Sequence, residues 1–390
     1  MAVSFDNTEV AFSGKSAEDL NRSYWLFKMV SRPSVVNLGK ALTDFALKFR
    51  LPIKALIKAT IFRQFVGGEN ISECRQTITE LGKYEIGTIL DYSVEGAETE
   101  EAFDSCTRET LETIALAGKT KHIPFCVFKV TGLARFSLLE KVSKGEALNE
   151  NEKNEYQKVK DRVLSICNAA FQTGVPVFID AEESWIQVAV DDLANDMMSR
   201  FNKVRPIIYN TFQLYRKDRL EYLRHAFDLA RKNDYKLGAK LVRGAYMEKE
   251  RLRASELHYP SPIQESKADT DRDYDAAIVF CVEHIEQVGL CAGTHNEQSS
   301  MLLVNLLEKL NIPHNHPNIC FSQLYGMSDH ISFNLAKSGY HVAKYVPYGP
   351  VKEVLPYLIR RAQENTSVKG QTGRELSLIM KEKERRKRDK

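Results

Sequence analysis

Residues 237–246 read Leu-Gly-Ala-Lys-Leu-Val-Arg-Gly-Ala-Tyr, a short apolar run that ends in glycine and polar positions. Its first part predicts a buried strand, and Gly244 marks a point where the backbone comes close to a neighbouring group. Arg243 precedes this glycine and Tyr246 follows it. In parallel α/β proteins, ligands bind at the carboxyl ends of the strands. The stretch therefore predicts a strand leading into a binding loop, and a core strand before an ordinary surface loop is the alternative.

The same pattern, a short apolar strand followed by a helical stretch, recurs along the chain. Strands are predicted at 86–93, 123–130, 175–180, 207–213, 237–243, 289–294, 318–323 and 341–346. The intervening segments show the 3.6-residue period of helices, and each is long enough for a right-handed crossover between parallel strands. Eight strands alternating with eight helices predict an α/β fold, a TIM-type (β/α)8 barrel over residues 86–370.

An open, doubly wound sheet is the alternative fold for this alternation. That class usually carries a glycine-rich dinucleotide turn after its first strand. Here the first strand runs into Tyr-Ser-Val-Glu-Gly-Ala at 92–97, which is not a G-x-G-x-x-G sequence. The barrel is therefore favoured.

The composition is that of an ordinary globular protein, with 43% apolar and 27% charged residues among 390. A net charge of +3 is too small to indicate nucleic-acid binding, so no nucleic-acid partner is expected. The seven cysteines are scattered, which predicts reduced core thiols, and no metal-ligand pattern occurs. The sequence has no signal pattern and no run of about 18 apolar residues, so we expect a cytoplasmic protein that does not span a membrane.

Both ends of the chain are basic. Between residues 21 and 63, nine Lys and Arg residues accompany a single acidic residue, Asp44. Residues 381–390 hold seven basic and three acidic side chains. We expect an N-terminal helical extension over 1–85 that packs on the barrel, and a solvated basic tail over 371–390. The alternative is peripheral contact with anionic lipid at the inner face of the cytoplasmic membrane.

Polar or ionisable residues stand at or just after the carboxyl end of every predicted strand. In chain order they are Glu95, Lys129, Asp180, Gln213, Lys240 with Arg243 and Tyr246, Thr294 with His295, Gln323 and Tyr345. For any one of them, a polar loop position is an adequate explanation. Together they have the placement that a barrel active site requires.

A helix predicted over about 351–364 follows the last strand. On it, Tyr357 and Arg361 share one face, and Arg360 and Glu364 share the neighbouring face. Two adjacent guanidinium groups beside a tyrosine suit a planar carboxylate, which arginine binds through paired hydrogen bonds. Exposed helix arginines that pair with Glu364 are the alternative.

These segments together resemble the proline dehydrogenase family, the FAD-dependent enzymes of proline catabolism. The matching segments are LDYSVEG (90–96), FKVTGL (128–133), FIDAEE (178–183), YNTFQLY (209–215), KLVRGAY (240–246), THN (294–296), SQLYGM (322–327), KYVPYGP (344–350) and YLIRRAQEN (357–365). The resemblance implies a distorted (β/α)8 barrel whose last helix lies over the mouth of the barrel.

The resemblance also implies a role for each matched residue. Substrate binding falls to Lys129, Leu241, Tyr246, Tyr345, Tyr357, Arg360 and Arg361, with the two arginines on the carboxylate of L-proline. Contacts to FAD fall to Ala181, Gln213, Arg243, Gly244, Ala245, Thr294, His295, Gln323 and Glu364. Asp180 and Lys240 are expected to act beside the flavin ring, and Glu95 to pair with Arg360 as a gate. Lys240 stands where bacterial relatives often have arginine. Its ammonium group is a single point donor and cannot make the paired hydrogen bonds of a planar guanidinium.

The implied reaction is the oxidation of L-proline to Δ1-pyrroline-5-carboxylate, the first step of proline catabolism to glutamate. Electrons are expected to pass from the reduced flavin to a membrane quinone. The basic ends of the chain would then bring the protein to the membrane surface. Two alternatives stay open at this point. One is a hydroxyproline dehydrogenase of the same fold, and the other is a non-catalytic barrel that binds amino acids.

Overall fold

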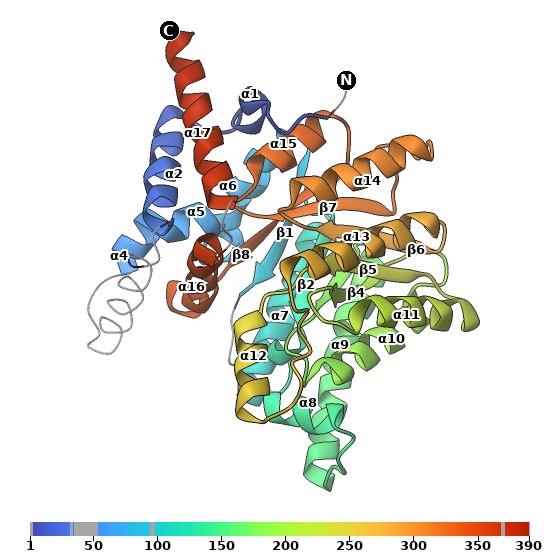
Figure 1. Ribbon diagram of the computed structural model, residues 1–390. Helices are drawn as coiled ribbons and strands as arrows, with labels where there is room; N and C mark the ends of the chain where they lie inside the picture. Colours follow the sequence, from blue (N-terminus) through green and yellow to red (C-terminus); the bar gives the residue numbers. More distant parts are fainter. Residues whose placement is uncertain (1–2, 32–33, 35–53, 94–97, 368–370, 390) are drawn as a thin grey trace. The chain divides into compact units, whose positions relative to one another are not determined.

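The computed structural model describes residues 3–31, 34, 54–93, 98–367 and 371–389. In these residues, eight parallel strands follow one another in chain order around a closed barrel (Figure 1). The strands are β1 (Ile86–Tyr92), β2 (Phe125–Lys129), β3 (Val177–Asp180), β4 (Ile208–Gln213), β5 (Leu237–Val242), β6 (Val288–Gly293), β7 (Ile319–Leu324) and β8 (Val342–Tyr348). Each boundary lies within two residues of the predicted one. The predicted (β/α)8 fold is confirmed.

Each strand is followed by one or two helices. They are α7 (Glu100–Ala117), α8 (Phe136–Ser143), α9 (Glu150–Thr173), α10 (Gln187–Phe201), α11 (Arg219–Lys232), α12 (Met247–Glu256), α13 (Lys267–Glu283), α14 (Glu297–Lys309), α15 (Asp329–Lys337) and α16 (Val351–Ser367), with a short 3-10 turn η2 (Val130–Gly132) before α8. Local sequence sets their limits. Asn149 and Glu152 form a capping box that starts α9, and Gly174 ends the helix at a φ of +71°.

The chain divides into two compact units, each described separately below. The first unit comprises residues 1–95 and 323–390, and the second comprises residues 96–322. The first unit contains β1 and β8, which pair in parallel from Ile86↔Val342 to Tyr92↔Tyr348. The second unit contains β2 to β6 and most of β7. The domain limits predicted after residues 85 and 370 remain a proposal.

An aromatic cluster from β2, β3 and β4 fills the interior of the second unit. The ring centroids of Phe125 and Phe178 lie 4.6 Å apart, and those of Phe178 and Tyr209 lie 5.4 Å apart. Two glycines paired across β5 and β6 make room for the tyrosine. A Cβ atom on Gly238 would lie 2.8 Å from Cγ of Tyr209, and one on Gly289 would lie 2.3 Å from its hydroxyl oxygen. The glycines therefore allow the Tyr209 ring to pack against the strands.

The N-terminal part of the first unit is helical, as predicted from its apolar and aromatic residues. Its described elements are α1 (Thr8–Ala11), α2 (Ala17–Val30), α4 (Lys54–Ile57), the π-helical turn η1 (Lys58–Phe62), α5 (Arg63–Phe65) and α6 (Ile71–Gly82). A capping box between Ser16 and Asp19 starts α2. Four of the predicted basic residues, Arg32, Lys40, Lys48 and Arg50, lie outside the described residues.

The basic end of the chain forms a packed helix, α17 (Gln371–Arg388). Leu378 and Ile379 are buried in an apolar cluster with residues of α2. The Arg386 guanidinium donates to the carbonyl oxygens of Phe12 and Lys15, both at 2.8 Å. The prediction of a solvated tail is therefore wrong for α17, because the apolar residues on one of its faces outweigh the charged residues around them.

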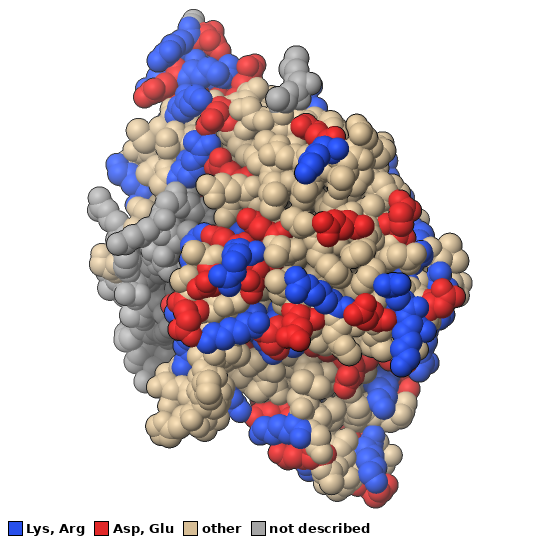
Figure 2. All heavy atoms as spheres, turned by 45° about the vertical axis from the view of Figure 1, so that its right-hand side comes forward, with Lys and Arg blue, Asp and Glu red and all other residues tan. Residues whose placement is uncertain are grey.

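Two composition-based predictions, on the cysteines and on membrane-spanning segments, can be compared with the described residues. All seven cysteines fall within them, and each is a buried thiol outside any disulfide. Among the described helices, none has both the length and the apolar character of a bilayer-crossing segment. Figure 2 shows one face of the molecule, on which acidic and basic side chains are interspersed. That face therefore presents no extended field of one sign.

We expect Gly238→Ala to lower the free energy of unfolding by about 2–4 kcal/mol. The added Cβ would lie only 2.2 Å from the carbonyl oxygen of Ile208 and would also contact Tyr209. The matched control is Gly373→Ala, because a Cβ there meets no atom within 4 Å and α17 gains helix propensity. Thermal melting of the three proteins measures the effect. Equal melting temperatures for Gly238→Ala and the wild type would contradict this packing.

Candidate active site

Three charged side chains meet at the carboxyl ends of β2, β3 and β5. Lys240 Nζ lies 2.6 Å from Oδ1 of Asp180, and Lys129 Nζ lies 3.6 Å from Oδ2 of the same carboxylate. Lys129 and Asp180 are partners in the parallel register. Asp180 and Lys240 are only 8% and 6% exposed. Two ammonium groups on one carboxylate leave a formal excess of one positive charge in a largely buried place.

The alternation of side chains along a strand explains why these residues meet. Asp180 lies two positions after Phe178 on β3, and Lys240 lies two positions after Gly238 on β5, so they point to the same face as the aromatic cluster. Lys240 Nζ lies 5.2 Å from the centroid of the Phe178 ring, where the ring attracts a cation. By the same alternation, the fully buried Leu241 points away from the Lys240 side of β5.

Glu182, in the loop after β3, is a buried acid to which the sequence analysis gave no role. Its carboxylate accepts hydrogen bonds from the Thr131 backbone N–H at 3.2 Å and the Thr131 hydroxyl at 2.5 Å. Its backbone carbonyl accepts from Nε2 of Gln213 at 2.6 Å. Burial raises the pKa of Glu182 to about 7, and the hydrogen bonds from Thr131 only partly oppose this rise. Glu182 thus joins the carboxyl ends of β2, β3 and β4. Its position in FIDAEE, just past a predicted strand, could have indicated from the sequence that it belongs to this group of strand-end residues.

Arg243, just after β5, lies beside the amino terminus of α14. Its guanidinium donates to the Asp271 carboxylate at 2.7 Å and to the hydroxyls of Thr294 and Ser299 at 2.6 and 2.9 Å. Burial works against ionisation of Asp271, but hydrogen bonds from Lys267 and Arg243 lower its pKa overall. An arginine and hydroxyls next to a helix amino terminus form a donor set that suits a phosphate group.

The backbone after Arg243 is open to a ligand. Gly244 has a φ of +138°, and a Cβ on it would lie 2.5 Å from the ring of Tyr215, so only glycine fits. Gly244 and Ala245 are exposed, Tyr246 is partly buried, and α12 begins directly after them. Together with Arg243 and the amino terminus of α14, this segment fits the diphosphate part of FAD. His295 is partly buried next to Thr294, and Ala181 is partly buried next to Asp180.

In the first unit, predicted site residues lie on β7 and β8. Gln323 is 1% exposed, and its Oε1 accepts from the hydroxyl of Ser332 at 2.8 Å. Tyr345 is 7% exposed, and its carbonyl accepts from the backbone N–H of Tyr325 at 2.9 Å. Both side chains are therefore held in the core of this unit.

The predicted face of the last helix is also present in the first unit. Tyr357 and Arg361 lie one turn apart on α16, each 6% exposed, and the guanidinium carbon of Arg361 lies 5.0 Å from the Tyr357 ring centroid. Arg360 is partly buried. Glu364 belongs to α16, but its side chain lies outside the described residues, and so does all of Glu95. The predicted pairing of Glu95 with Arg360 remains a prediction.

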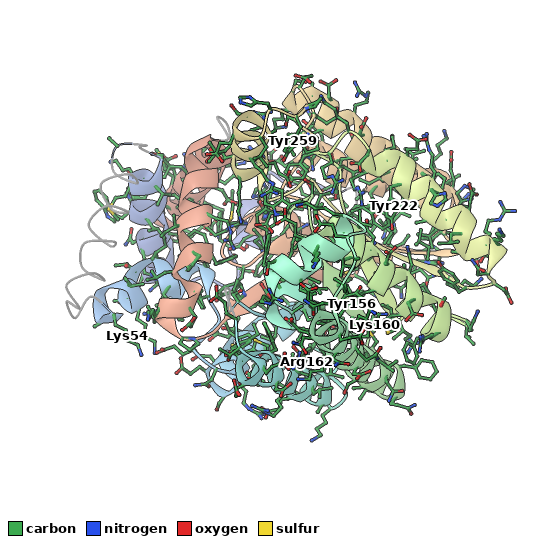
Figure 3. All side chains as sticks on the ribbon, turned by 90° about the horizontal axis from the view of Figure 1, so that it is seen from below. Lys54, Tyr156, Lys160, Arg162, Tyr222 and Tyr259 are labelled. Carbon is green, nitrogen blue, oxygen red and sulfur yellow. The ribbon has the colours of Figure 1, made fainter. Side chains whose placement is uncertain are left out.

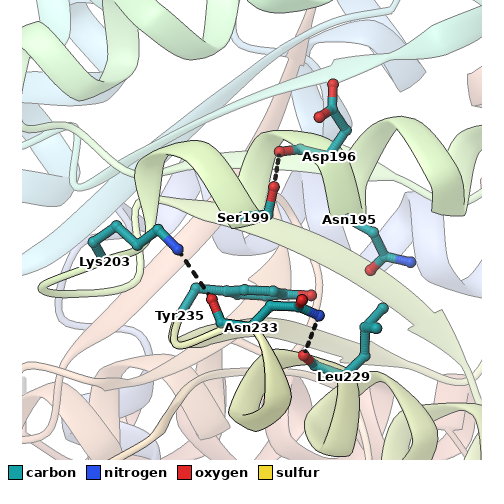
Figure 4. A pocket seen from close by; sticks show the side chains of 7 residues that line it. All are labelled: Asn195, Asp196, Ser199, Lys203, Leu229, Asn233 and Tyr235. Atoms are coloured by element: carbon teal, nitrogen blue, oxygen red, sulfur yellow. Dashed lines mark hydrogen bonds between the residues drawn. The ribbon is translucent and has the colours of Figure 1, made fainter.

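A pocket in the second unit is lined by none of the residues predicted for the site. The residues that line it come from the last turns of α10 and α11 and the segments that follow these helices (Figure 4): Asn195, Asp196, Ser199, Lys203, Leu229, Asn233 and Tyr235. These segments lead into the amino ends of β4 and β5. Because barrel enzymes use the opposite, carboxyl ends of their strands, this pocket does not compete with the site around Asp180.

A closed barrel of parallel strands with charged side chains at their carboxyl ends is the arrangement of a (β/α)8-barrel enzyme. The family model described as "Proline dehydrogenase" matches residues 74–374. The mitochondrial proline dehydrogenase 1 of Dictyostelium discoideum is 34% identical over 97% of this chain and 74% of its own length. The chain therefore belongs to the proline dehydrogenase family.

Two further similarities bear on the substrate and the fold. The hydroxyproline dehydrogenase of Xenopus laevis is 31% identical over 99% of this chain and 90% of its own length. The crystal structure of proline utilization A from Bdellovibrio bacteriovorus, inactivated by N-propargylglycine, has a TM-score of 0.71 and 21% identity. It covers 94% of this chain, which spans 37% of that longer protein. The latter similarity supports the barrel fold alone.

We expect Glu182→Gln to remove a pH-dependent loss of stability. Below pH 4.5 Glu182 is protonated in both the folded and the unfolded state, whereas between pH 4.5 and about 7 only the unfolded state releases its proton. Wild-type stability should therefore fall across this window, relative to the variant, by on the order of 3 kcal/mol. Unfolding of both proteins in the same cofactor state at pH 5 and pH 8 measures this difference, and a pH-independent difference would contradict it.

Proposed function

We propose that the protein uses FAD to oxidise L-proline to Δ1-pyrroline-5-carboxylate, the first step of proline catabolism to glutamate. The observation that carries the proposal is the Asp180 carboxylate contacted by Lys240 and Lys129 at the carboxyl ends of strands, in a barrel of the proline dehydrogenase family. When bound, FAD would supply the acceptor for one hydride, which carries both electrons away from ring carbon C5, while the amine loses one proton.

The proposed contacts to the cofactor are as follows. In the second unit, Arg243, Gly244, Ala245, Thr294 and His295 would hold the phosphates, since an arginine, hydroxyls and exposed backbone are grouped there. The remaining proposed contacts are Ala181, Gln213, Gln323 and Glu364. Lys240 would donate to the flavin ring, and the hydrogen bond that Asp180 accepts would orient its Nζ.

The substrate carboxylate would be bound by Arg360 and Arg361, whose planar guanidinium groups match a carboxylate. The contact of Arg361 with Tyr357 supports this role, because the ring holds the guanidinium plane in place. Tyr246, Tyr345 and Tyr357 would enclose the ring of proline and exclude water from the developing imine. The substrate contact predicted for Leu241 does not fit, because this side chain points to the face of β5 opposite to that of Lys240. Lys129 would lie beside the substrate, and Glu95 would close the site by pairing with Arg360.

Tyr345 favours proline over hydroxyproline as the substrate. A tyrosine at this position should crowd a 4-hydroxyl group, and its backbone is held by Tyr325 in a well-packed strand. Exclusion by a steric clash can change kcat/KM by roughly ten- to several-hundred-fold. We therefore propose L-proline as the preferred substrate, and hydroxyproline oxidation by the same fold is the second candidate.

Anaerobic addition of L-proline should bleach the flavin absorbance near roughly 450 nm, and NADH should not. We expect kcat/KM for L-proline to exceed that for trans-4-hydroxy-L-proline by at least about tenfold. Arg361→Met should lower kcat/KM for both substrates alike, by on the order of 2–4 kcal/mol in transition-state binding, and leave their ratio nearly unchanged. A protein without flavin would support a non-catalytic barrel, and a preference for hydroxyproline would overturn the substrate assignment.

We further propose a membrane quinone as the electron acceptor, reached by peripheral contact at the inner face of the cytoplasmic membrane. On α2, Trp25 and Met29 lie one turn apart and are 58% and 47% exposed. Lys28 Nζ lies 5.0 Å from the Trp25 ring centroid. An exposed tryptophan and methionine beside a cation suit the interface of an anionic bilayer.

Sedimentation with vesicles tests this membrane contact. The protein should bind vesicles that contain anionic lipid at low salt and be released as the Debye length falls to about 8 Å and below. Trp25→Ser should weaken the binding, whereas Val204→Ser, at an 87% exposed site of the second unit, should not. Equal binding to zwitterionic vesicles would contradict the electrostatic part of the proposal.

A further inference from the structure

A buried ion cluster in the first unit takes no part in the roles described so far. Asp329, the first residue of α15, lies 2.9 Å from Lys344 Nζ of β8 and 2.7 Å from Lys15 Nζ in the segment before α2. Lys344 is 0% exposed and Asp329 is 6% exposed. Lys344 Nζ also donates to the carbonyl of Met327. One carboxylate therefore joins three segments that are distant in sequence.

A fourth segment reaches the same place from α17. Glu375, which is 3% exposed, accepts from the backbone N–H of Ser328, and its carboxylate lies 3.9 Å from Nδ1 of His330. Ser328 has a φ of +50°, which is uncommon for a residue with a side chain. Side chains from β8 and α17 thus hold the turn between β7 and α15 in a conformation that it would not favour by itself.

Burial opposes the ionisation of both Lys344 and Asp329. Burial lowers the pKa of Lys344, and the Asp329 carboxylate only partly offsets this effect. Conversely, Lys15 and Lys344 lower the pKa of Asp329 although burial opposes its ionisation. Well-packed apolar residues are often at least as stabilising as a buried ion pair. These charges are therefore better explained by the segments that they hold in place than by a gain in stability.

The cluster holds two predicted site residues, Tyr345 and Gln323, in position. Lys344 immediately precedes Tyr345, and the Tyr345 carbonyl accepts from Tyr325 in the same β7–α15 turn. The Ser332 hydroxyl donates to Oε1 of Gln323 and lies 3.3 Å from the carbonyl of Ser328. A shift of this turn or of β8 would therefore move Tyr345 and Gln323 together.

We propose that Asp329, Lys344 and Lys15 are positioning residues that fix Tyr345 and Gln323, and that Lys15 and Glu375 make the two chain ends part of the site's scaffold. The inference rests on the proposed function, because the roles of Tyr345 and Gln323 come from it. It implies that a side chain in the N-terminal segment, outside the strands and helices of the barrel, controls substrate selectivity.

Hydrogen exchange in Lys15→Met tests the physical coupling without reference to activity. Lys15 is partly exposed, so this variant should fold. Peptides covering 323–328 and 342–348 should exchange about tenfold faster than in the wild type. Arg374→Met is the matched control, because Arg374 pairs with Asp6 at 2.8 Å between the same two chain ends but does not contact Asp329. Unchanged exchange in Lys15→Met, or an equal increase in the control, would overturn the proposal.

Substrate selectivity tests the consequence for the site. Lys15→Met and Lys344→Met should reduce the ratio of kcat/KM for L-proline to that for trans-4-hydroxy-L-proline several-fold, in the direction expected when Tyr345 itself is replaced by a smaller residue. Arg162→Met is the control for loss of a buried cation, because Arg162 (Figure 3) is 8% exposed and joins α9 to the exposed carboxylates of Asp104 and Glu100 on α7. It should lower the melting temperature and leave the ratio within about twofold.

A wild-type ratio in both lysine variants would overturn the proposal. If the wild-type protein oxidises neither imino acid, the proposed function fails, and the exchange comparison still decides whether the cluster holds β8 and the turn.

Discussion

The contact of two lysines with the Asp180 carboxylate is the interaction on which the second unit depends. Burying an ammonium group costs free energy unless an anion lies close to it. Asp180 supplies this anion to Lys240 and Lys129 at the same time. The contact exists because the parallel register places the ends of β2, β3 and β5 together. In the same register, Gly238 and Gly289 are partners and leave room for the Tyr209 ring.

The same arrangement, one aspartate paired with two lysines, occurs a second time in the first unit, where we give it a different role. There too a buried aspartate, Asp329, pairs with two lysines. The Asp180 group lies at strand ends, where a ligand can approach, whereas the Asp329 group lies among β8, α15 and the chain ends. We therefore assign reactivity to the first group and positioning to the second.

Much of the fold and part of the site could be predicted from the sequence. Strand limits follow from short apolar runs, and Asp180, Lys240 and Arg243 could be proposed because each stands at a strand end. The pairing of Lys240 with Asp180 could not be predicted, since the two residues are 60 positions apart and lie on β3 and β5, with β4 between these strands. The Asp329 cluster was missed for the same reason, as Lys15 and Glu375 are distant in sequence and lie outside the barrel strands. The packing of α17 was missed because its charge was weighed more heavily than the spacing of Leu378 and Ile379.

The most direct test of the account is the rate at which L-proline reduces the flavin of Asp180→Asn under anaerobic conditions. An asparagine keeps the size of the side chain but removes the charge that the buried Lys240 and the partly buried Lys129 share. With fold and flavin content unchanged, the account predicts a reduction rate lower than that of the wild type by on the order of tenfold or more. A rate equal to that of the wild type would contradict the placement of the active site around Asp180.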